Sequence, residues 1–396
     1  MRNGKILFDA THTSHTSAQT GIQRVCRALF EEIATDSGVT PICFDPHQIG
    51  WRPLVAEELA VLRDRSGGAG KSRGAKWTMS QKISGAARRW LGARAKLPKA
   101  TGLICPELFS AKVGARLPEL LQVVSGPRVA VFYDAIPLKF PELTPPGTVA
   151  RFPSYLRELL LFDGVAAISE DSAASLREYW QWLGVANVPS VQAIPLGVDS
   201  PPTLASSETP NATPALPRIL SVGTIEGRKN HLALLEAAET LWREGVKFEL
   251  ELIGLPRADT AGAALAKIET LRAAGHPLIF RGSVSEASLH QAYARAAFTV
   301  YPSLIEGFGL PVLESLQHGK PCICSARGAL GESAGGGGCV ALDSVTAVTL
   351  SAVLRRLLVD AEQLSVLTAA ARQRTFKSWT GYAREFTAWM QNLPRR

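Results

Sequence analysis

Long apolar runs are missing from this sequence. No segment reaches the eighteen or so uncharged apolar residues of a membrane-spanning helix, and the first five residues, MRNGK, lead into no apolar secretion signal. Cysteine is scarce, and its six copies form no C-x-x-C pair and no zinc spacing, so we expect free buried thiols. These absences predict a cytoplasmic protein.

Signatures of two cofactor chemistries are also missing. His12 and His15 have a spacing that suits a metal, but no third ligand lies near them in the sequence, so we predict no metal site there. No G-x-G-x-x-G follows the first strand-like run, residues 5–9, which argues against a dinucleotide oxidoreductase. We therefore expect no bound cofactor.

Positive charge is present in excess but is concentrated in one region. The formal net charge of the 396-residue chain is +8, which suggests an anionic partner such as nucleic acid, a membrane surface or a phosphorylated small molecule. Lysine and arginine gather between residues 63 and 99, where Asp64 is the single acid. No RNA- or DNA-binding motif accompanies this charge, so we predict no nucleic acid partner.

Part of this basic insert has the pattern of an amphipathic helix. Within residues 78–95, Met79, Ile83, Trp90 and Leu91 share one helical face, and basic residues lie beside or opposite it. A basic amphipathic helix with tryptophan predicts peripheral attachment to an anionic membrane, here the inner face of the plasma membrane. The alternative is a solvated, mobile insert with no partner.

Strand-like and helix-like segments alternate along both halves of the chain. In the first half, short apolar runs cover residues 5–9, 41–45, 102–105, 128–134, 164–169 and 191–196, with an amphipathic helix at 21–34. In the second, they cover 218–223, 248–254, 277–284, 298–303 and 321–325, with helices at 231–242, 286–296 and from about 309. Continuous apolar strands between helices predict an α/β fold with two doubly wound, Rossmann-like domains facing an interdomain cleft.

The domain boundary is predicted from composition. Residues 201–217 are rich in proline, serine and threonine and lack periodicity, as a linker does. We therefore expect a first domain over 1–200, which contains the basic insert of about 63–99, and a second domain over 218–380. The last segment, 381–396, is predicted to form a helix that packs back on the first domain.

The first candidate binding motif is SVGTIEGRKN, residues 221–230. It follows a predicted strand and opens a helix. Its glycines allow close approach of the backbone, and Gly223 and Thr224 are candidate binding residues. Arg228 and Lys229 place two cations beside the start of that helix, a combination that suits a diphosphate.

The second motif is EGFGLPVLE, residues 306–314. Its turn joins a strand to a helix that begins near Pro311, so the backbone amides of Gly307, Phe308, Gly309 and Leu310 are available to an anion or to sugar hydroxyls. Glu306 and Glu314 lie on either side of the turn, and carboxylates accept hydrogen bonds from vicinal diols.

Together these motifs resemble a known family. Glu306 and Glu314 match the E-x7-E signature, and EGFGLPVLESLQHGKPCICS resembles the donor site of retaining family-4 glycosyltransferases with the GT-B fold. The resemblance extends to residues 20–24, 133–141, 167–173, 194–199 and 221–230, which occur along the chain in the same order as in the family. It implies an acceptor-side first domain and a second domain that binds a nucleotide sugar.

The resemblance also implies roles for individual residues. Arg228 and Lys229 would bind the donor diphosphate, and Glu314 would bind the ribose. Glu306 would hold the transferred sugar together with the amides of residues 307–310. In the first domain, Gly21 and Arg24 resemble a loop that closes over the phosphates. Asp134 falls near the reacting centre, where the family often has a histidine; here Tyr133 precedes it.

The implied reaction is transfer of a hexose with retention of anomeric configuration, in which the leaving phosphate takes the acceptor's proton. The chain has no D-x-D metal clamp, so we predict a metal-independent enzyme. TGIQR and DAIPLKFPE are most similar to mannosyltransferases that use GDP-mannose, which implies a saccharide or lipid-linked saccharide acceptor in polysaccharide or O-antigen synthesis. The alternatives are a UDP-sugar donor, or a non-catalytic scaffold that binds a nucleotide sugar.

Overall fold

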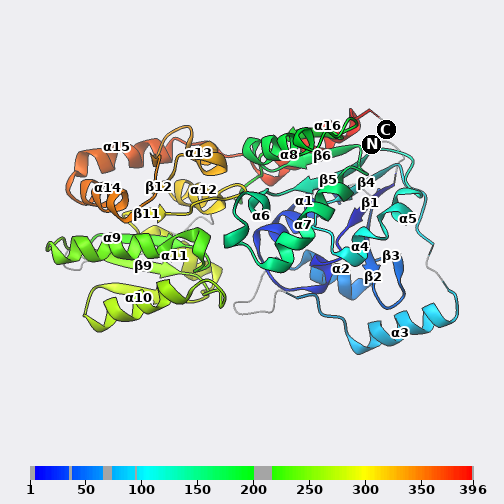
Figure 1. Cartoon of the computed structure of the whole chain (residues 1–396), viewed down its shortest axis with the longest axis horizontal. Coiled ribbons are helices and arrows are strands. Elements are labelled where there is room, and N and C mark those ends of the chain that lie inside the picture. The colour runs from blue at the N-terminus through cyan, green and yellow to red at the C-terminus, as the bar shows by residue number, and fades with distance from the viewer. Residues whose placement is uncertain (1–4, 35–37, 66–73, 94–95, 200–215, 395–396) are drawn as a thin grey trace. The chain divides into compact units, whose positions relative to one another are not determined.

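The chain forms two compact units. The computed structural model describes residues 5–34, 38–65, 74–93, 96–199 and 216–394 (Figure 1). Unit 1 consists of Met1–Gly197 and Trp379–Arg396, and unit 2 consists of Val198–Ser378. The linker predicted at 201–217 lies almost wholly outside the described residues.

Unit 1 is built on a seven-stranded sheet in the order β3-β2-β1-β4-β5-β6-β7. Its neighbouring strands pair in parallel, except β3, which pairs antiparallel with β2. The strands are β1 (Ile6–Asp9), β2 (Val39–Asp45), β3 (Gly50–Pro53), β4 (Gly102–Cys105), β5 (Arg128–Phe132), β6 (Gly164–Ala167) and β7 (Ser190–Ala193). The central strands β1, β4, β5 and β6 are almost wholly buried, which explains their continuous apolar sequences.

Helices connect these strands. They are η1 (Thr13–His15), α1 (Gly21–Ile33), α2 (Ala56–Arg63), α3 (Met79–Trp90), α4 (Ala111–Gly114), α5 (Leu117–Leu121), α6 (Ile136–Lys139), η2 (Pro141–Leu143), α7 (Pro146–Leu159), α8 (Glu170–Trp182) and α16 (Trp379–Gln391). The final helix, α16, packs against α1. Its buried residues include Tyr382, Phe386 and Met390, so the end of the chain contributes to the core of unit 1.

Unit 2 repeats the same plan with a six-stranded parallel sheet in the order β10-β9-β8-β11-β12-β13. The strands are β8 (Arg218–Val222), β9 (Glu249–Ile253), β10 (Leu278–Arg281), β11 (Phe298–Tyr301), β12 (Cys322–Ser325) and β13 (Cys339–Leu342). The helices are η3 (Gly227–Lys229), α9 (His231–Arg243), α10 (Gly262–Ala273), α11 (Glu286–Arg295), α12 (Leu310–Gln317), α13 (Gly328–Ala334), α14 (Ala347–Val359) and α15 (Ala361–Arg372).

The predicted doubly wound α/β class is confirmed by these two sheets. The sequence pattern missed two short edge strands, β3 and β13, which are only partly buried and do not read as apolar runs. All six cysteines are free thiols. No helix in the described part of the chain is long and apolar enough to cross a membrane.

Candidate active site

The predicted site in unit 2 lies at the point where the strand order of its sheet reverses. From β8 the chain winds toward β9 and β10 on one side, and it later returns to place β11 on the other side of β8. The loops that leave the carboxyl ends of β8 and β11 therefore diverge at this point, which is where open α/β sheets bind ligands. These two loops carry residues 223–230 and 302–309, so the topology brings both predicted motifs to one place.

The two motifs meet in a buried cluster of ion pairs. Glu306 Oε1 lies 2.5 Å from Lys229 Nζ, and Glu306 Oε2 lies 2.7 Å from Arg228 NH1. Lys229 also donates to the Tyr301 hydroxyl at the end of β11, and the amide of Leu304 donates to the Arg228 carbonyl over 2.8 Å. The partners in these contacts lie 72 or more residues apart in sequence, so the sheet, not local geometry, assembles them.

This arrangement refines the roles expected of the charges. We expected Glu306 to face a sugar while the cations face phosphate, but in this structure Glu306 itself bridges both cations. Glu226 binds Arg228 from the other side at 2.8 Å and also binds Arg257. Arg257 is also paired with Asp259 at 2.9 Å, so three cations stand against three carboxylates in this cluster.

Burial and charge act in opposite directions on these groups. Burial alone would raise the pKa of Glu306, but Lys229 and Arg228 outweigh it and lower that pKa to about 2. Burial lowers the pKa of Lys229, and Glu306 opposes this by favouring the ammonium form. The carboxylate is therefore ionised at neutral pH and holds two like charges close together.

A glycine turn covers the next part of the site. Gly309 has φ of 110°, and a Cβ on it would meet the Ser333 hydroxyl at 3.0 Å, so both conformation and space favour glycine there. Ser333 donates to the Phe308 carbonyl over 2.7 Å and fixes the turn. Helix α12 begins at Leu310, and the first amides of a helix have no partner within it, which leaves donors available to an anion.

Glu314 lies on α12 within a second cluster, which the sequence did not predict. It accepts a hydrogen bond from the Tyr293 hydroxyl over 3.3 Å, and the Tyr293 ring stacks on His318. His318 contacts His290 through ring nitrogens 3.0 Å apart. Burial and then His290 lower the pKa of His318 to about 4, so its ring is neutral at physiological pH.

Two further buried polar groups of unit 2 escaped the sequence interpretation. His231, the first residue of α9, is 3% exposed, and its Nδ1 has no hydrogen-bond partner among the described residues. Burial and the neighbouring Lys229 lower its pKa to about 3. The hydroxyl of Ser221, on β8, likewise has no partner in the described part of the chain. The motif SVGTIEGRKN marked this loop, but only the fold shows that His231 is buried beside Lys229.

Three of the remaining predicted residues belong to unit 1 and two to unit 2. Gly21 begins α1, and a Cβ on it would contact nothing within 4 Å; the amide of Arg24 donates to the Thr20 carbonyl within the first turn. Asp134 follows β5 and accepts from the Ile136 amide over 3.0 Å, at the start of α6. Gly223 and Thr224 directly follow β8 in unit 2, beside Lys229.

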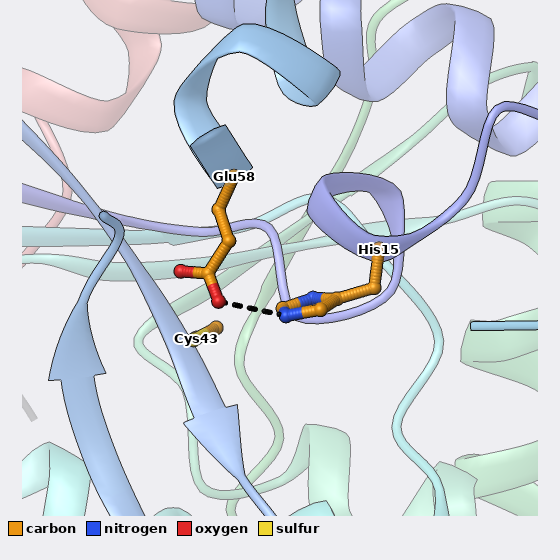
Figure 2. Close-up of side chains that lie close together, drawn as sticks. All are labelled: His15, Cys43 and Glu58. Atoms are coloured by element: carbon orange, nitrogen blue, oxygen red, sulfur yellow. Dashed lines mark hydrogen bonds and ion pairs between the residues drawn. The ribbon is translucent and has the colours of Figure 1, made fainter. Parts of the chain in front are cut away.

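One group of described side chains has the composition of a metal site. His15, Cys43 and Glu58 converge in unit 1, and Figure 2 shows His15 and Glu58 joined by a contact of 3.0 Å. Arg52, however, donates to both oxygens of Glu58 over 2.7 Å, and burial raises the pKa of the Cys43 thiol. A cation would sit beside a guanidinium with a protonated thiol, so these residues do not fit a metal.

Comparison with known proteins identifies the family. Residues 207–374 match the model of the glycosyl transferases group 1 family. Over 345 residues the chain is 27% identical to the serotype-specific mannosyltransferase WbdA of Escherichia coli, covering 81% of this chain. Residues 207–374 therefore belong to the group 1 glycosyltransferase family. The chain spans only 38% of WbdA, so the whole activity of that larger protein does not transfer directly.

A further relative agrees with this glycosyltransferase assignment, and solved structures share the fold. The O-antigen chain mannosyltransferase B of E. coli is 35% identical over 151 residues, 38% of this chain and 39% of that protein. Sucrose-phosphate synthase from Thermosynechococcus elongatus superposes with a TM-score of 0.68 at 19% identity, covering 99% of both chains. The structure of Anabaena Alr3699/HepE in complex with UDP and glucose superposes with a TM-score of 0.66 at 14% sequence identity, covering 99% of this chain and 100% of that one. The predicted GT-B fold is confirmed.

Proposed function

We propose that this glycosyltransferase moves a hexose, mannose from GDP-mannose, to a saccharide or lipid-linked saccharide acceptor in polysaccharide or O-antigen synthesis, with retention of configuration. The observation that carries the proposal is the buried cluster of Arg228, Lys229 and Glu306 at the switch point of unit 2. The named mannosyltransferases among its relatives support the choice of sugar.

The chemistry of transfer explains why such a cluster is useful. As the glycosidic bond breaks, negative charge grows on the departing diphosphate and positive charge on the sugar ring. Arg228 and Lys229 would neutralise the diphosphate, and the amides of residues 307–310 would bind oxygens of the donor. Because Glu306 already holds the two cations together, the site is organised before the donor arrives and reorganises little in the transition state.

The other residues keep the roles proposed from the family. Glu314, on the same helix α12 that begins at the glycine turn, would accept from the ribose hydroxyls. Gly21 and Arg24 would contribute from unit 1, and Asp134 would lie near the reacting centre. The leaving phosphate would take the acceptor's proton, so we propose a mechanism that needs neither a separate base nor a metal.

A UDP-sugar donor is the second candidate, and the solved relative that contains UDP and glucose favours testing it. The experiment is a thermal-shift panel of GDP-mannose, UDP-glucose, UDP-GlcNAc, ADP-glucose and dTDP-glucose, followed by a transfer assay with the donor that binds. We expect GDP-mannose to give the largest stabilisation. A larger shift with UDP-glucose would replace the donor, and binding without transfer to any saccharide would favour a non-catalytic scaffold.

We also propose that unit 1 attaches to anionic membranes through α3. This helix exposes Met79, Ile83, Trp90 and Leu91 by 64–86% of their surface, while Gly85 alone is buried, against the β2–β3 turn. The basic residues beside this apolar face match an anionic lipid surface. The chain should sediment with vesicles containing phosphatidylglycerol and not with phosphatidylcholine vesicles; sedimentation with neither would disprove attachment.

A further inference from the structure

Unit 1 contains a cavity of about 420 Å³ that none of the proposed donor-site roles uses. This volume falls in the range of small-molecule sites, roughly 300–1,000 Å³. Its lining combines apolar walls with two carboxylates; the members used below are Ile22, Phe44, Pro46, Trp77, Asp9 and Glu107. The lining residues all belong to unit 1.

The cavity lies at the point where the strand order of the sheet in unit 1 reverses. The chain winds from β1 to β2 on one side, and later places β4 on the other side of β1. Asp9 ends β1, Phe44 lies near the end of β2, and Glu107 follows β4, so three strand ends meet at the cavity. This is the position at which an open α/β sheet forms a ligand site, and it is the counterpart in unit 1 of the Arg228 cluster in unit 2.

The two carboxylates at this position are both buried but are used differently. Glu107 accepts from the amides of His12 and Thr13 at 2.7 Å each, and from the Thr13 hydroxyl, so it holds the loop after β1. Asp9 is 1% exposed and uses Oδ1 to accept from the amide and hydroxyl of Thr11. Its second oxygen, Oδ2, has no hydrogen-bond partner among the described residues. A buried carboxyl oxygen on a cavity wall is therefore available to a ligand.

The charges around the cavity favour a neutral occupant over an anion. Asp9 and Glu107 contribute two carboxyl groups, and among the lining residues Lys112, which is exposed, is the one permanent cation. Burial, reinforced by Glu107, raises the pKa of Asp9 to about 7, so near neutral pH this side chain offers both an O–H donor and an acceptor. Hydroxyl groups satisfy such a side chain, whereas a phosphate does not.

Trp77 supplies a rigid aromatic wall. It belongs to the basic insert and lies just before α3, and its ring stacks on His15 with 3.8 Å between centroids. The amide of the preceding residue, Lys76, donates to the His15 carbonyl over 2.7 Å. The segment is thus fixed to η1 by both backbone and ring contacts.

His15 is in turn held by a buried network, of which Figure 2 shows the contact between His15 and Glu58. Glu58 binds the His15 ring at 3.0 Å and Arg52 through two bonds of 2.7 Å, and Arg52 binds Asp45 at 2.9 Å. Arg52 also lies over the Trp77 ring at 5.7 Å. The network that resembles a metal site by composition therefore acts as a support for Trp77, and His15 and Glu58 are positioning residues.

An occupant must match an aromatic wall on one side and hydrogen-bonding carboxyl oxygens on the other. A sugar ring does so, because one face presents C–H groups that pack on the negative face of an aromatic ring, while its edge carries hydroxyls. We infer that this cavity is a saccharide subsite. In it a neutral sugar ring packs against Trp77, and one of its hydroxyl groups donates a hydrogen bond to Asp9. The inference rests on the proposed transferase function and assigns its acceptor to this cavity.

The test measures saccharide binding and donor binding separately. Mannotriose is titrated calorimetrically into the full chain without donor, and GDP-mannose is titrated in a parallel series. We expect Trp77→Ala to weaken mannotriose binding at least tenfold and Trp77→Phe by less than threefold, because phenylalanine keeps an aromatic face. Neither variant should change GDP-mannose affinity. Trp182→Ala, which removes a tryptophan that is 80% exposed on α8, is the matched control and should bind both ligands normally.

Each possible result has a distinct meaning. Unchanged mannotriose binding in Trp77→Ala, or no mannotriose binding by the wild type, overturns the subsite. Loss of GDP-mannose binding in Trp77→Ala would assign the cavity to the nucleotide and also overturn it. If the wild type binds mannotriose through Trp77 but no nucleotide sugar, the subsite stands and the proposed transferase function fails. Thermal melting of each variant identifies any that is unfolded.

Discussion

The two units place different ionisable groups at the same position of the same fold. In each unit, the loop after the first strand lies next to the loop after a neighbouring strand that comes later in the chain. These strands are β1 and β4 in unit 1, and β8 and β11 in unit 2. Unit 1 brings Asp9 and Glu107 there, and unit 2 brings Lys229 and Glu306. The doubly wound fold thus fixes where a ligand binds, and the side chains fix which ligand.

The contrast is clearest in the two carboxyl groups that have been removed from water. Burial alone would raise the pKa of either one. Glu306 has two cations beside it and its pKa falls to about 2, whereas Asp9 has Glu107 and its pKa rises to about 7. Unit 2 is therefore suited to an anion and unit 1 to a neutral ligand with hydroxyls.

The largest expected effect is on catalysis. Arg228→Ala removes a cation that would face the leaving diphosphate, and we expect kcat to fall about 10²- to 10³-fold. The measurement is steady-state transfer from the donor identified by the panel. Arg243→Ala is the control, because Arg243 lies on the adjacent helix α9 with its side chain 72% exposed. Equal kcat for Arg228→Ala and the wild type would break the assignment of unit 2 to the diphosphate.

The next effect is on stability. Glu306→Gln removes the carboxylate that Arg228 and Lys229 share, which leaves Glu226 paired only with Arg228 and Arg257, and we expect it to lower the free energy of unfolding by about 3–5 kcal/mol at pH 7. Because the folded-state pKa of Glu306 lies below its usual 4.5, the wild-type advantage is complete above pH 4.5 and is lost as the pH falls toward about 2. Urea unfolding at pH 7, 4 and 3 should therefore show a shrinking difference.

A matched control distinguishes this buried cluster from surface pairing. Glu244→Gln removes one partner of the exposed Arg355–Glu244 pair, and such pairs contribute about 0–1 kcal/mol. We expect little change in unfolding free energy and little pH dependence of the difference. A loss as large as that of Glu306→Gln would mean that burial does not distinguish the two sites.

The smallest effect should have the opposite sign with pH. Asp9 is held neutral in the folded state, so its contribution to stability is greatest below pH 4 and declines as the pH rises through about 7. Asparagine resembles the neutral form and does not ionise. We expect Asp9→Asn to gain about 1–3 kcal/mol relative to the wild type between pH 4 and pH 8.

Asp343→Asn, at an exposed position, is the control and should show a difference from the wild type that is constant with pH. The measurement is the same urea titration at pH 4, 6 and 8. A difference between Asp9→Asn and the wild type that shrinks as the pH rises would contradict the electrostatic contrast between the units.

Sequence periodicity was sufficient for most of the sheet. The run GLIC was predicted as a strand over residues 102–105, and β4 has those limits, because a strand covered on both faces must be apolar throughout. The edge strand β13 was missed: it follows a run of glycines and is only partly buried, so its pattern is not that of a core strand.

The sites show where sequence reasoning ends. Motif resemblance located Arg228, Lys229 and Glu306, but the ion pairs between them span 77 or more residues and appear only when β8 and β11 pair. Asp9 and Glu107 belong to no motif considered, and they meet because β1 and β4 are neighbours. Trp77 looked like part of a basic insert, and its contact with His15 depends on the tertiary fold.

The most direct test of the contrast between the units is a double dissociation in ligand binding, with Arg228→Ala and Trp77→Ala each titrated with GDP-mannose and with mannotriose. Our account predicts that Arg228→Ala loses affinity for the nucleotide sugar and keeps it for the saccharide, and that Trp77→Ala does the reverse. If one variant weakened both ligands while the other weakened neither, the two switch points would not be separate sites and the account would be contradicted.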